Sequence, residues 1–274
     1  MIDLHLHTTA SDGDDAPEAL VARAKAAGLT TIAVTDHDTM AGVPAAVAAA
    51  RGAGIDVVAG IEITAVWQGR DVHVLGYFLD PSSPALAAFV EGQGTDRLRR
   101  ARRVGERLDA LGIHIDVDAL ITASCSRPVS RPAIADALVA GGHVRDRGEA
   151  FAMYLAEDAQ AYVPRRGASP EEVVRLIREA GGLSSLAHPG LTGIDDRIPD
   201  LARAGLDAIE IYHPEHQAGQ IHMYLALART LNLGVTGGSD CHGEQSHYQG
   251  GLGTCTCPPE QFDDLCRRVR RCVP

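Results

Sequence analysis

Residues 2–7 read Ile2-Asp3-Leu4-His5-Leu6-His7, a short predicted strand that ends in two histidines. Side chains two positions apart on a strand point to the same face, so His5 and His7 are presented together and can bind one ion. A chance pair of histidines on a polar strand face would have the same spacing. The stretch therefore has to be judged with the rest of the chain.

Short β-branched runs alternate with alanine-rich helical stretches from this strand to about residue 80, which is typical of βα units. The pattern predicts strands at 2–6, 31–35, 56–64 and 71–79, and helices at 17–27 and 43–53. The alternation returns near residue 170, with predicted strands at 183–187, 208–212 and 234–237 and helices at 170–180, 198–204 and 218–231. Two blocks of the chain thus share one α/β pattern.

The strand signal is missing between the two blocks, where long polar or alanine-rich helical segments take its place. We interpret residues 81–166 as a helical insertion that covers the active site, and residues 1–80 and 167–274 as a metal-binding barrel. Residues 91–166 carry 12 arginines and 11 acidic side chains, so the insertion is locally the basic part of the chain.

The whole chain is acidic, with 36 acidic against 25 basic side chains, a net charge of -11 and a single lysine, Lys25. This balance argues against a protein that binds long duplex nucleic acid or a membrane surface through a basic face. The hydrophobic share of 45% is too high for disorder, and no apolar run approaches the ~20 residues of a membrane span. The oligomeric state stays open.

The amino terminus has neither the basic start nor the apolar stretch of a signal peptide, so we expect a cytoplasmic protein. The cysteines then need no disulfide bonds. Buried free thiols are the simpler expectation for Cys255 and Cys257, and a zinc site that uses both is the alternative.

Carboxylates and imidazoles stand at the carboxyl end of nearly every predicted strand, which is the rim where barrel-like α/β folds build their sites. Independent surface histidines have no reason to follow this rule. The candidate metal ligands are six histidines and three carboxylates: His5, His7, Asp12, His37, Glu62, His73, His188, Asp240 and His242. At about four to six ligands per ion, including waters, this set predicts two or three divalent metal ions. Mixed imidazole and carboxylate ligands suit Mn²⁺, Fe²⁺ or Zn²⁺.

The motifs resemble those of the PHP family, the polymerase and histidinol phosphatase superfamily of metal-dependent phosphoesterases. The matching residues are Asp3-Leu4-His5-Leu6-His7, Thr35-Asp36-His37-Asp38, His188-Pro189 and Ser239-Asp240-Cys241-His242. The chain is most similar to small stand-alone members that act on 3',5'-bisphosphonucleotides and on the 5' ends of short RNAs, including ribonuclease AM-like enzymes. This resemblance implies a distorted (β/α)7 barrel with a helical insertion and three metals.

The resemblance also implies a ligand set for each ion. One metal would be held by His5, His7, Glu62 and Asp240, a second by Asp12, His37 and His242, and a third by Glu62, His73 and His188, with Glu62 as a bridge. We expect Asp3, Asp36 and Asp38 to be caps of strand ends or partners of the metal-bound imidazoles.

The expected chemistry is attack of a metal-bridging hydroxide on phosphorus. The candidate catalytic residues are Asp12, Glu62, His213 and Arg131, and the general acid stays open between a metal-bound water and a pocket histidine. Candidates for phosphate binding are Arg127, Arg131, His213 and His216. Ala133 and Met153 stand where a histidine and a lysine are expected in the stand-alone relatives.

Two further groups of arginines are either solvent-exposed side chains without a specific role or part of the substrate-binding surface. Arg165 and Arg166 are either a solvated pair or a source of charge for the substrate. The run from Arg97 to Arg103 is expected to be a solvated helical face, and guidance of RNA towards the site is the alternative.

The favoured function is a phosphatase of 3',5'-bisphosphonucleotides that also acts as a 5'-to-3' exonuclease on short RNA. One alternative is a histidinol-phosphate phosphatase, which would need a pocket for a cationic imidazole rather than for a second phosphate. Another is a catalytically silent metal-binding or regulatory module. The complete ligand set argues against the silent module, and the Arg127 and Arg131 pair argues against histidinol phosphate.

Overall fold

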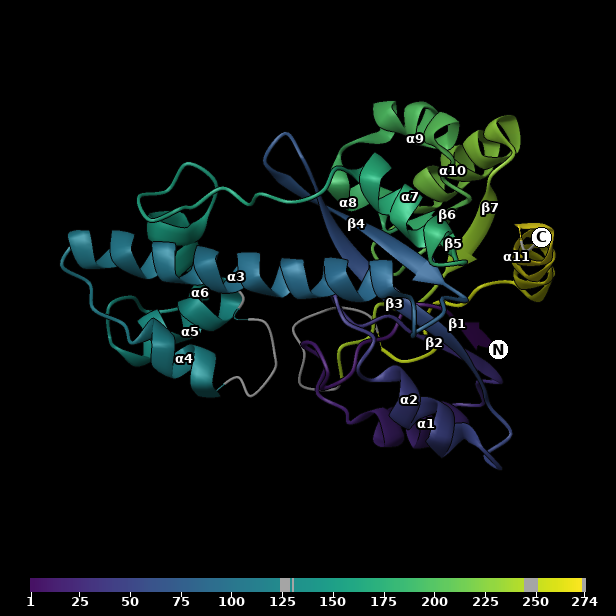
Figure 1. Cartoon of the computed structure of the whole chain (residues 1–274), viewed down its shortest axis with the longest axis horizontal. Coiled ribbons are helices and arrows are strands. Elements are labelled where there is room, and N and C mark those ends of the chain that lie inside the picture. Colours follow the sequence, from purple (N-terminus) through teal and green to yellow (C-terminus); the bar gives the residue numbers. More distant parts are fainter. Residues whose placement is uncertain (124–128, 130, 244–250, 273–274) are drawn as a thin grey trace. The chain divides into compact units, whose positions relative to one another are not determined.

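The computed structural model describes residues 1–123, 129, 131–243 and 251–272 of the 274-residue chain (Figure 1). The chain divides into two compact units. The barrel unit comprises Met1–Phe89 and Ala168–Pro274, and the insertion unit comprises Val90–Gly167. The first boundary falls inside the long helix α3 (Pro84–Ala110), whose first residues belong to the barrel unit.

The described residues of the barrel unit form one seven-stranded sheet in which the strands follow each other in chain order. The strands are β1 (Ile2–Asp3), β2 (Thr31–Val34), β3 (Asp56–Trp67), β4 (Arg70–Tyr77), β5 (Leu183–Leu186), β6 (Ala208–Tyr212) and β7 (Gly234–Gly237). β1, β2 and β3 run parallel to each other, as do β5, β6 and β7. β4 is antiparallel to both of its neighbours.

The first and last strands of the sheet meet just beyond their ends. The Leu4 amide donates a hydrogen bond to the Gly237 carbonyl at 3.2 Å, and Leu6 forms a parallel bridge with Cys241. The prediction of a distorted seven-stranded α/β barrel is therefore confirmed. β1 is shorter than predicted because the ladder is interrupted beyond Asp3, where the Leu6 amide donates to the Thr35 hydroxyl at 3.0 Å.

The strands β3 and β4 form a hairpin that the sequence pattern did not reveal. We predicted a third strand that ends at Thr64, but β3 continues to Trp67 and turns directly into β4. Because the two strands are antiparallel, His73 near the start of β4 lies opposite Thr64 near the end of β3. Glu62 and His73 therefore reach the same rim although both lie within strands.

Helices α1 (Pro17–Ala26) and α2 (Val43–Ala50) lie together beside the first strands (Figure 1). Pro17 stands in the first turn of α1, where its missing amide hydrogen costs nothing. Both helices bury alanine and branched aliphatic side chains in one apolar cluster that includes Leu20, Val43 and Leu6. Burial of this apolar face, rather than helix propensity, holds the helices on the sheet.

The second half of the barrel unit carries further helices. They are α7 (Pro170–Glu179), α8 (Pro189–Thr192), the 3₁₀ turn η2 (Asp195–Arg197), α9 (Ile198–Ala204), α10 (Ala218–Leu231) and α11 (Pro259–Cys272). α7 begins with a capping box in which Ser169 and Glu172 exchange hydrogen bonds with each other's amides. α11 was not predicted, and its Leu265 is fully buried in a cluster with Ile2 and Leu4.

The described residues of the insertion unit form helices that are joined by turns and irregular segments. It contains most of α3, then α4 (Val117–Ala123), α5 (Arg131–Ala140), α6 (Arg147–Ala150) and a π-helical turn η1 (Phe151–Leu155). It has an apolar cluster of its own, which includes Leu108, Ile134, Leu138 and Leu155. None of the helices in the described ranges of the chain is both long and apolar enough to cross a membrane.

Candidate metal centre

His5 and His7 follow β1 and bring their Nε2 atoms to the same two carboxylates. The Nε2 atoms of both residues lie 3.3 Å from Glu62 Oε2. Asp240 Oδ1, from the segment after β7, lies 3.2 Å from His5 Nε2 and 3.0 Å from His7 Nε2. These four side chains offer ligand atoms that all lie within 4.8 Å of one another.

A second group of potential ligands surrounds Asp12 in the turn after β1. Asp12 lies 3.8 Å from His37 Nε2, 3.4 Å from His242 Nε2 and 3.7 Å from His7 Nδ1. The side chain of Asp12 is 45% exposed, whereas that of His242 is 2% exposed. This group therefore combines buried imidazoles with a carboxylate that faces solvent.

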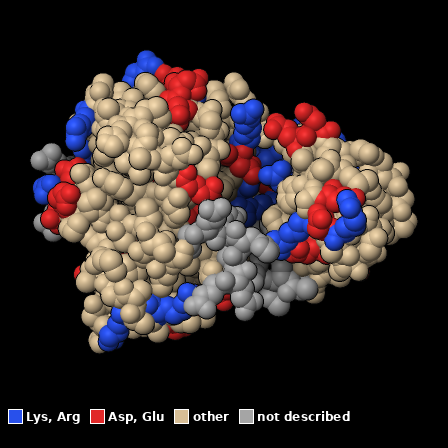
Figure 2. Space-filling view, turned by 180° about the vertical axis from the view of Figure 1, so that it is seen from behind, with Lys and Arg blue, Asp and Glu red and all other residues tan. Residues whose placement is uncertain are grey.

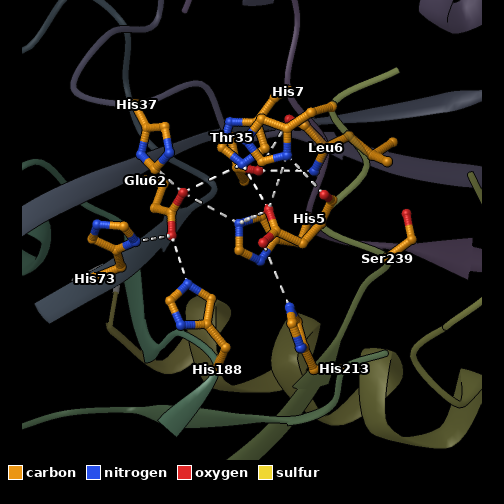
Figure 3. Close-up of polar contacts among 12 residues, drawn as sticks. His5, Leu6, His7, Thr35, His37, Glu62, His73, His188, His213 and Ser239 are labelled. Atoms are coloured by element: carbon orange, nitrogen blue, oxygen red, sulfur yellow. Dashed lines mark hydrogen bonds and ion pairs between the residues drawn. The ribbon is translucent and has the colours of Figure 1, made fainter. Parts of the chain in front are cut away.

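A third group is centred on Glu62, toward which three imidazoles point (Figure 3). Glu62 Oε1 lies 2.9 Å from His73 Nδ1 and 3.2 Å from His188 Nε2, and Glu62 Oε2 lies 3.0 Å from His37 Nδ1. The compact trio consists of His37, Glu62 and His73, and His188 contacts the same Glu62 oxygen as His73. Glu62, His7 and His37 each belong to two of the three groups.

Several buried polar atoms of these side chains make no hydrogen bond with the residues that the structure describes. They include His5 Nε2, both ring nitrogens of His7, His37 Nδ1, Glu62 Oε2 and Asp240 Oδ1. A buried polar atom without a partner costs about 1–3 kcal/mol, so such a concentration needs a ligand. Imidazole nitrogens and carboxylate oxygens at this spacing are donors for divalent metal ions, and the site can hold them.

The charges of the site are strongly coupled. Burial alone would lower the pKa of His7, but the adjacent carboxylates of Asp240 and Glu62 outweigh it and raise the pKa to about 10. Burial would raise the pKa of Asp12, but the charge of His37 and the hydrogen bond to His242 lower it. Bound cations would replace these protons, because an imidazole must be neutral to bind a metal.

Glu210 is a buried residue of the site that the sequence analysis missed. It lies on β6, where its Oε1 accepts a hydrogen bond from His5 Nδ1 at 3.0 Å and its Oε2 accepts one from the His188 amide at 2.8 Å. Burial would raise the pKa of Glu210, but the charge of His5 and the hydrogen bond from it lower the pKa. The only signal in the sequence is a carboxylate inside an apolar strand, Ala208-Ile209-Glu210-Ile211-Tyr212.

The aspartates next to the motif histidines fix the backbone around the site. Asp3 accepts hydrogen bonds from the Ser239 amide and hydroxyl at 2.9 and 2.6 Å, and from the Gly253 amide at 3.0 Å. Asp36 accepts from the Thr8 amide and hydroxyl, both at 2.7 Å. These aspartates thus tie together the loops that carry the candidate ligands.

Three residues of the site have left-handed backbone, which is uncommon outside glycine. They are Asp38 with φ 48°, His188 with φ 27° and Asp240 with φ 51°. In this conformation the His188 amide donates a hydrogen bond to Glu210. The Asp38 carboxylate accepts a hydrogen bond from the Thr64 amide at 2.8 Å. Such strained positions cluster at functional sites, where the surrounding contacts hold them.

The two histidines after β6 have different roles. His213 is buried, its Nδ1 accepts a hydrogen bond from the Glu215 amide, and its Nε2 therefore carries the proton, 3.5 Å from Asp240 Oδ2. His216 donates from Nδ1 to the Ile211 carbonyl at 2.9 Å and accepts at Nε2 from the Gly190 amide at 3.2 Å. The backbone therefore contacts both ring nitrogens of His216, and its role in phosphate binding stays a prediction.

The predicted phosphate-binding arginines belong to the insertion unit. Arg131 is the first residue of α5, and Arg127 lies outside the described residues. Ala133 follows on α5, and Met153 in η1 is exposed. The role of Arg131 in phosphate binding stays a prediction.

The cysteines of the described ranges stay outside the candidate metal groups. Cys241 is buried in the apolar cluster of Leu6 and Leu20 although it stands between Asp240 and His242. Cys255 and Cys257 are free, and burial raises the pKa of both thiols to about 12. Neither belongs to a potential metal-ligand group of the described residues.

Comparisons with known proteins agree with this geometry. Residues 3–162 match the family model of the PHP domain. A 3',5'-nucleoside bisphosphate phosphatase of Chromobacterium violaceum is 37% identical over 248 residues, covering 88% of this chain and 87% of the relative. A 5'-3' exoribonuclease Rnm of Escherichia coli is 33% identical over 247 residues, covering 88% of this chain and 84% of the relative.

Solved structures are similar over almost the whole chain. An amidohydrolase from Chromobacterium violaceum, solved with bound sulfate and no metal, has a TM-score of 0.83 and 34% identity, covering 97% of this chain and 96% of the other. A protein of Bifidobacterium adolescentis that is assigned as a metal-dependent phosphoesterase has a TM-score of 0.85 and 33% identity, with the same coverage. The resemblance seen in the sequence motifs is thus confirmed, and the chain belongs to the PHP domain family.

Proposed function

We propose that this protein is a metal-dependent phosphoesterase that hydrolyses phosphate monoesters of 3',5'-bisphosphonucleotides and acts on the 5' end of short RNA. The observation that carries the proposal is the set of three overlapping ligand groups that share Glu62, His7 and His37. A site that holds neighbouring cations suits phosphoryl transfer, in which charge develops on several oxygens at once.

The proposed ligands follow the three groups. His5, His7, Glu62 and Asp240 would hold one ion. Asp12, His37 and His242 would hold a second, and Glu62 and His73, with His188 or His37, would hold a third. Two or three ions of Mn²⁺, Fe²⁺ or Zn²⁺ fit these donors. When bound, they would lower the pKa of a coordinated water and neutralise the phosphoryl oxygens.

The protein's own side chains supply orientation and a hydrogen-bond donor. Glu210 holds the His5 ring so that Nε2 faces the site, and its second oxygen holds the His188 backbone. The N–H at His213 Nε2 can donate a hydrogen bond to a phosphoryl oxygen, so we propose that His213 stabilises the negative charge of the phosphate. Arg131, with Arg127, remains our candidate for the second phosphate.

The substrate class is supported by the names of the relatives. A bisphosphate phosphatase and a 5'-3' exoribonuclease are more than 30% identical to this chain over most of its length. A third relative, from Eggerthella lenta, is 35% identical and is named phosphoribosyl 1,2-cyclic phosphate 1,2-diphosphodiesterase. A substrate panel therefore needs a cyclic phosphate as well.

The test is to measure phosphate release by the metal-loaded protein from a panel of substrates. The panel comprises adenosine 3',5'-bisphosphate, 5'-phosphorylated RNA oligomers, a ribose 1,2-cyclic phosphate and histidinol phosphate. We expect the bisphosphate and the RNA to be turned over fastest. Preference for histidinol phosphate or for the cyclic phosphate would overturn the substrate assignment. The assignment as a phosphoesterase would still hold.

A further inference from the structure

A pocket lies within the insertion unit, between one face of α3 and the segment that follows the helices. α3 contributes Gln93, Asp96, Arg97, Arg99, Arg100, Arg103 and Arg107, and the segment contributes Val163, Pro164, Arg165 and Arg166. The α3 residues recur at helical spacing and so form one stripe. Two arginine groups that are about 60 residues apart in the sequence thus line one cavity.

Part of this arginine set builds the pocket wall. Arg100 Nε donates to the Val163 carbonyl at 2.8 Å, and its guanidinium lies 5.9 Å from the centre of the Tyr162 ring. Arg107 donates to the Tyr162 carbonyl. These contacts fix the segment against α3, so the pocket is a built feature rather than a chance gap between loose side chains.

The remaining arginines give the pocket a charge that its own residues do not balance. Seven arginines and one acidic residue, Asp96, line it, and Asp96 pairs with Arg99 at 2.6 Å. Arg103 and Arg166 are exposed and form no hydrogen bond or ion pair with any residue in the described part of the chain.

This imbalance is local. Residues 91–166 as a whole are nearly neutral, with 12 arginines and 11 acidic side chains. Basic and acidic side chains also lie interspersed on the face of the insertion unit seen in Figure 2. Like charges gathered in a cavity repel each other, so their concentration here points to an anionic ligand.

The shape of the pocket narrows the class of anion. Its cavity volume of about 120 Å³ is well below the ~300 Å³ at the lower end for small-molecule pockets, which disfavours an entire nucleotide. The stripe from Arg97 to Arg107 is about 15 Å long at 1.5 Å per helical residue, which is longer than one phosphate group. A row of arginines suits a chain of phosphates, because guanidinium groups bind phosphate oxygens bidentately.

We propose that this arginine pocket binds backbone phosphates of short single-stranded RNA. The proposal rests on the phosphoesterase function proposed above, because an RNA substrate has phosphates beyond the one that is cleaved. The pocket differs from the proposed second-phosphate site, since Arg131 does not line it. It would therefore favour RNA oligomers over mononucleotides.

The test compares RNA binding by the metal-loaded protein and by the double variant Arg103→Ala with Arg166→Ala. Arg103 and Arg166 are replaced because Arg100 and Arg107 hold the pocket wall in place, and their loss would disturb its structure. The probe is a fluorescent single-stranded RNA of about ten nucleotides with hydrolysis-resistant 5' linkages. Its binding is measured by fluorescence anisotropy at several salt concentrations. We expect binding to weaken on the order of tenfold for each arginine removed. The slope of log affinity against log salt should fall by about 0.7 for each phosphate that the variant no longer neutralises.

Arg102→Ala is the matched control. Arg102 is on the same helix, pairs with Asp118 at 2.9 Å and does not line the pocket, so its removal should leave RNA binding within about twofold. Equal RNA affinity of the double variant and the unaltered protein would overturn the proposal, as would equal weakening by Arg102→Ala.

Hydrolysis of adenosine 3',5'-bisphosphate by the unaltered protein is measured in parallel and tests the proposed function separately. If that hydrolysis is present and the double variant binds RNA normally, the pocket assignment fails alone. If hydrolysis of every ester is absent, the proposed function fails, and the binding data still decide the pocket.

Discussion

Glu210 determines how His5 faces the candidate metal centre. It is fully buried and bonds both the His5 ring and the His188 backbone, so it links the segment after β1 to the segment after β5. A carboxylate that holds the second nitrogen of an imidazole fixes the ring and makes the other nitrogen a better metal ligand. Glu210 is therefore a positioning residue, because it touches His5 rather than the substrate.

Glu210→Gln should weaken metal binding by about 10–100-fold, since the amide keeps the shape but loses the charge that supports His5. Calorimetric titration with Mn²⁺ measures the affinity directly, and a large excess of Mn²⁺ should restore much of the phosphatase activity. The exposed Glu215→Gln is the control and should bind Mn²⁺ like the unaltered protein. Unchanged Mn²⁺ affinity in Glu210→Gln would show that its carboxylate only fills space.

The candidate ligands and Glu210 differ in how far the sequence predicts them. His5, His7, Asp240 and His242 fall in short motifs whose spacing already implies a shared face or loop. Glu210 lies in an apolar strand with no motif around it. Its partner His5 is 205 residues away, so their pairing exists only once the barrel has folded.

At the scale of elements, the strands were found from their apolar patterns but their directions were not. The β-branched runs marked β3 and β4, yet hydrophobic alternation is the same for a parallel and an antiparallel strand. A two-residue turn at Gln68 and Gly69, both with positive φ, makes the hairpin. This turn explains why Glu62 and His73 lie within strands and still meet.

Gly238, which follows β7, packs closely against the first motif. A Cβ at this position would lie 2.4 Å from the His5 amide nitrogen and 2.5 Å from the His5 Cβ. Gly238→Ala should lower the free energy of unfolding by about 1–3 kcal/mol, because backbone must move to relieve the clash. Chemical denaturation of the protein measures this loss.

Gly219→Ala is the control for that substitution. Gly219 lies in α10, and nothing would come within 4 Å of an added Cβ. Alanine there should leave stability unchanged or raise it by up to about 1 kcal/mol. Equal stability of Gly238→Ala and the unaltered protein would mean that the two segments do not pack this closely against each other.

At the scale of the whole molecule, the net charge of -11 is partly explained by the site. Glu62, Asp240 and Glu210 are buried together with histidines, and Asp3 and Asp36 tie the surrounding loops. Composition alone could predict this acidic barrel and a nearly neutral, arginine-containing insertion. It could not predict that Arg97 to Arg107 and Arg165 to Arg166 line one pocket, because that depends on how the chain returns to α3.

Metal removal should destabilise the protein, since the cations bind the folded site and not the unfolded chain. At a metal concentration about 100 times the dissociation constant, binding adds about 2.7 kcal/mol for each site. For a protein of this size, that corresponds to a rise in Tm of roughly 5–10 °C. Thermal unfolding after chelation and after adding Mn²⁺ back measures the difference, and identical Tm values would contradict the assignment of a metal centre.

The most direct test of the account is phosphate release from adenosine 3',5'-bisphosphate by the Mn²⁺-loaded protein and by its Glu62→Gln variant. Glu62 lies in two of the three ligand groups, so its loss should cost more than the ~100-fold expected for a residue that only orients a ligand. The exposed Glu179→Gln should keep full activity. We predict rapid release by the loaded protein and loss of more than about 100-fold in Glu62→Gln. Equal rates in the two proteins, or no release by the loaded protein, would contradict the account.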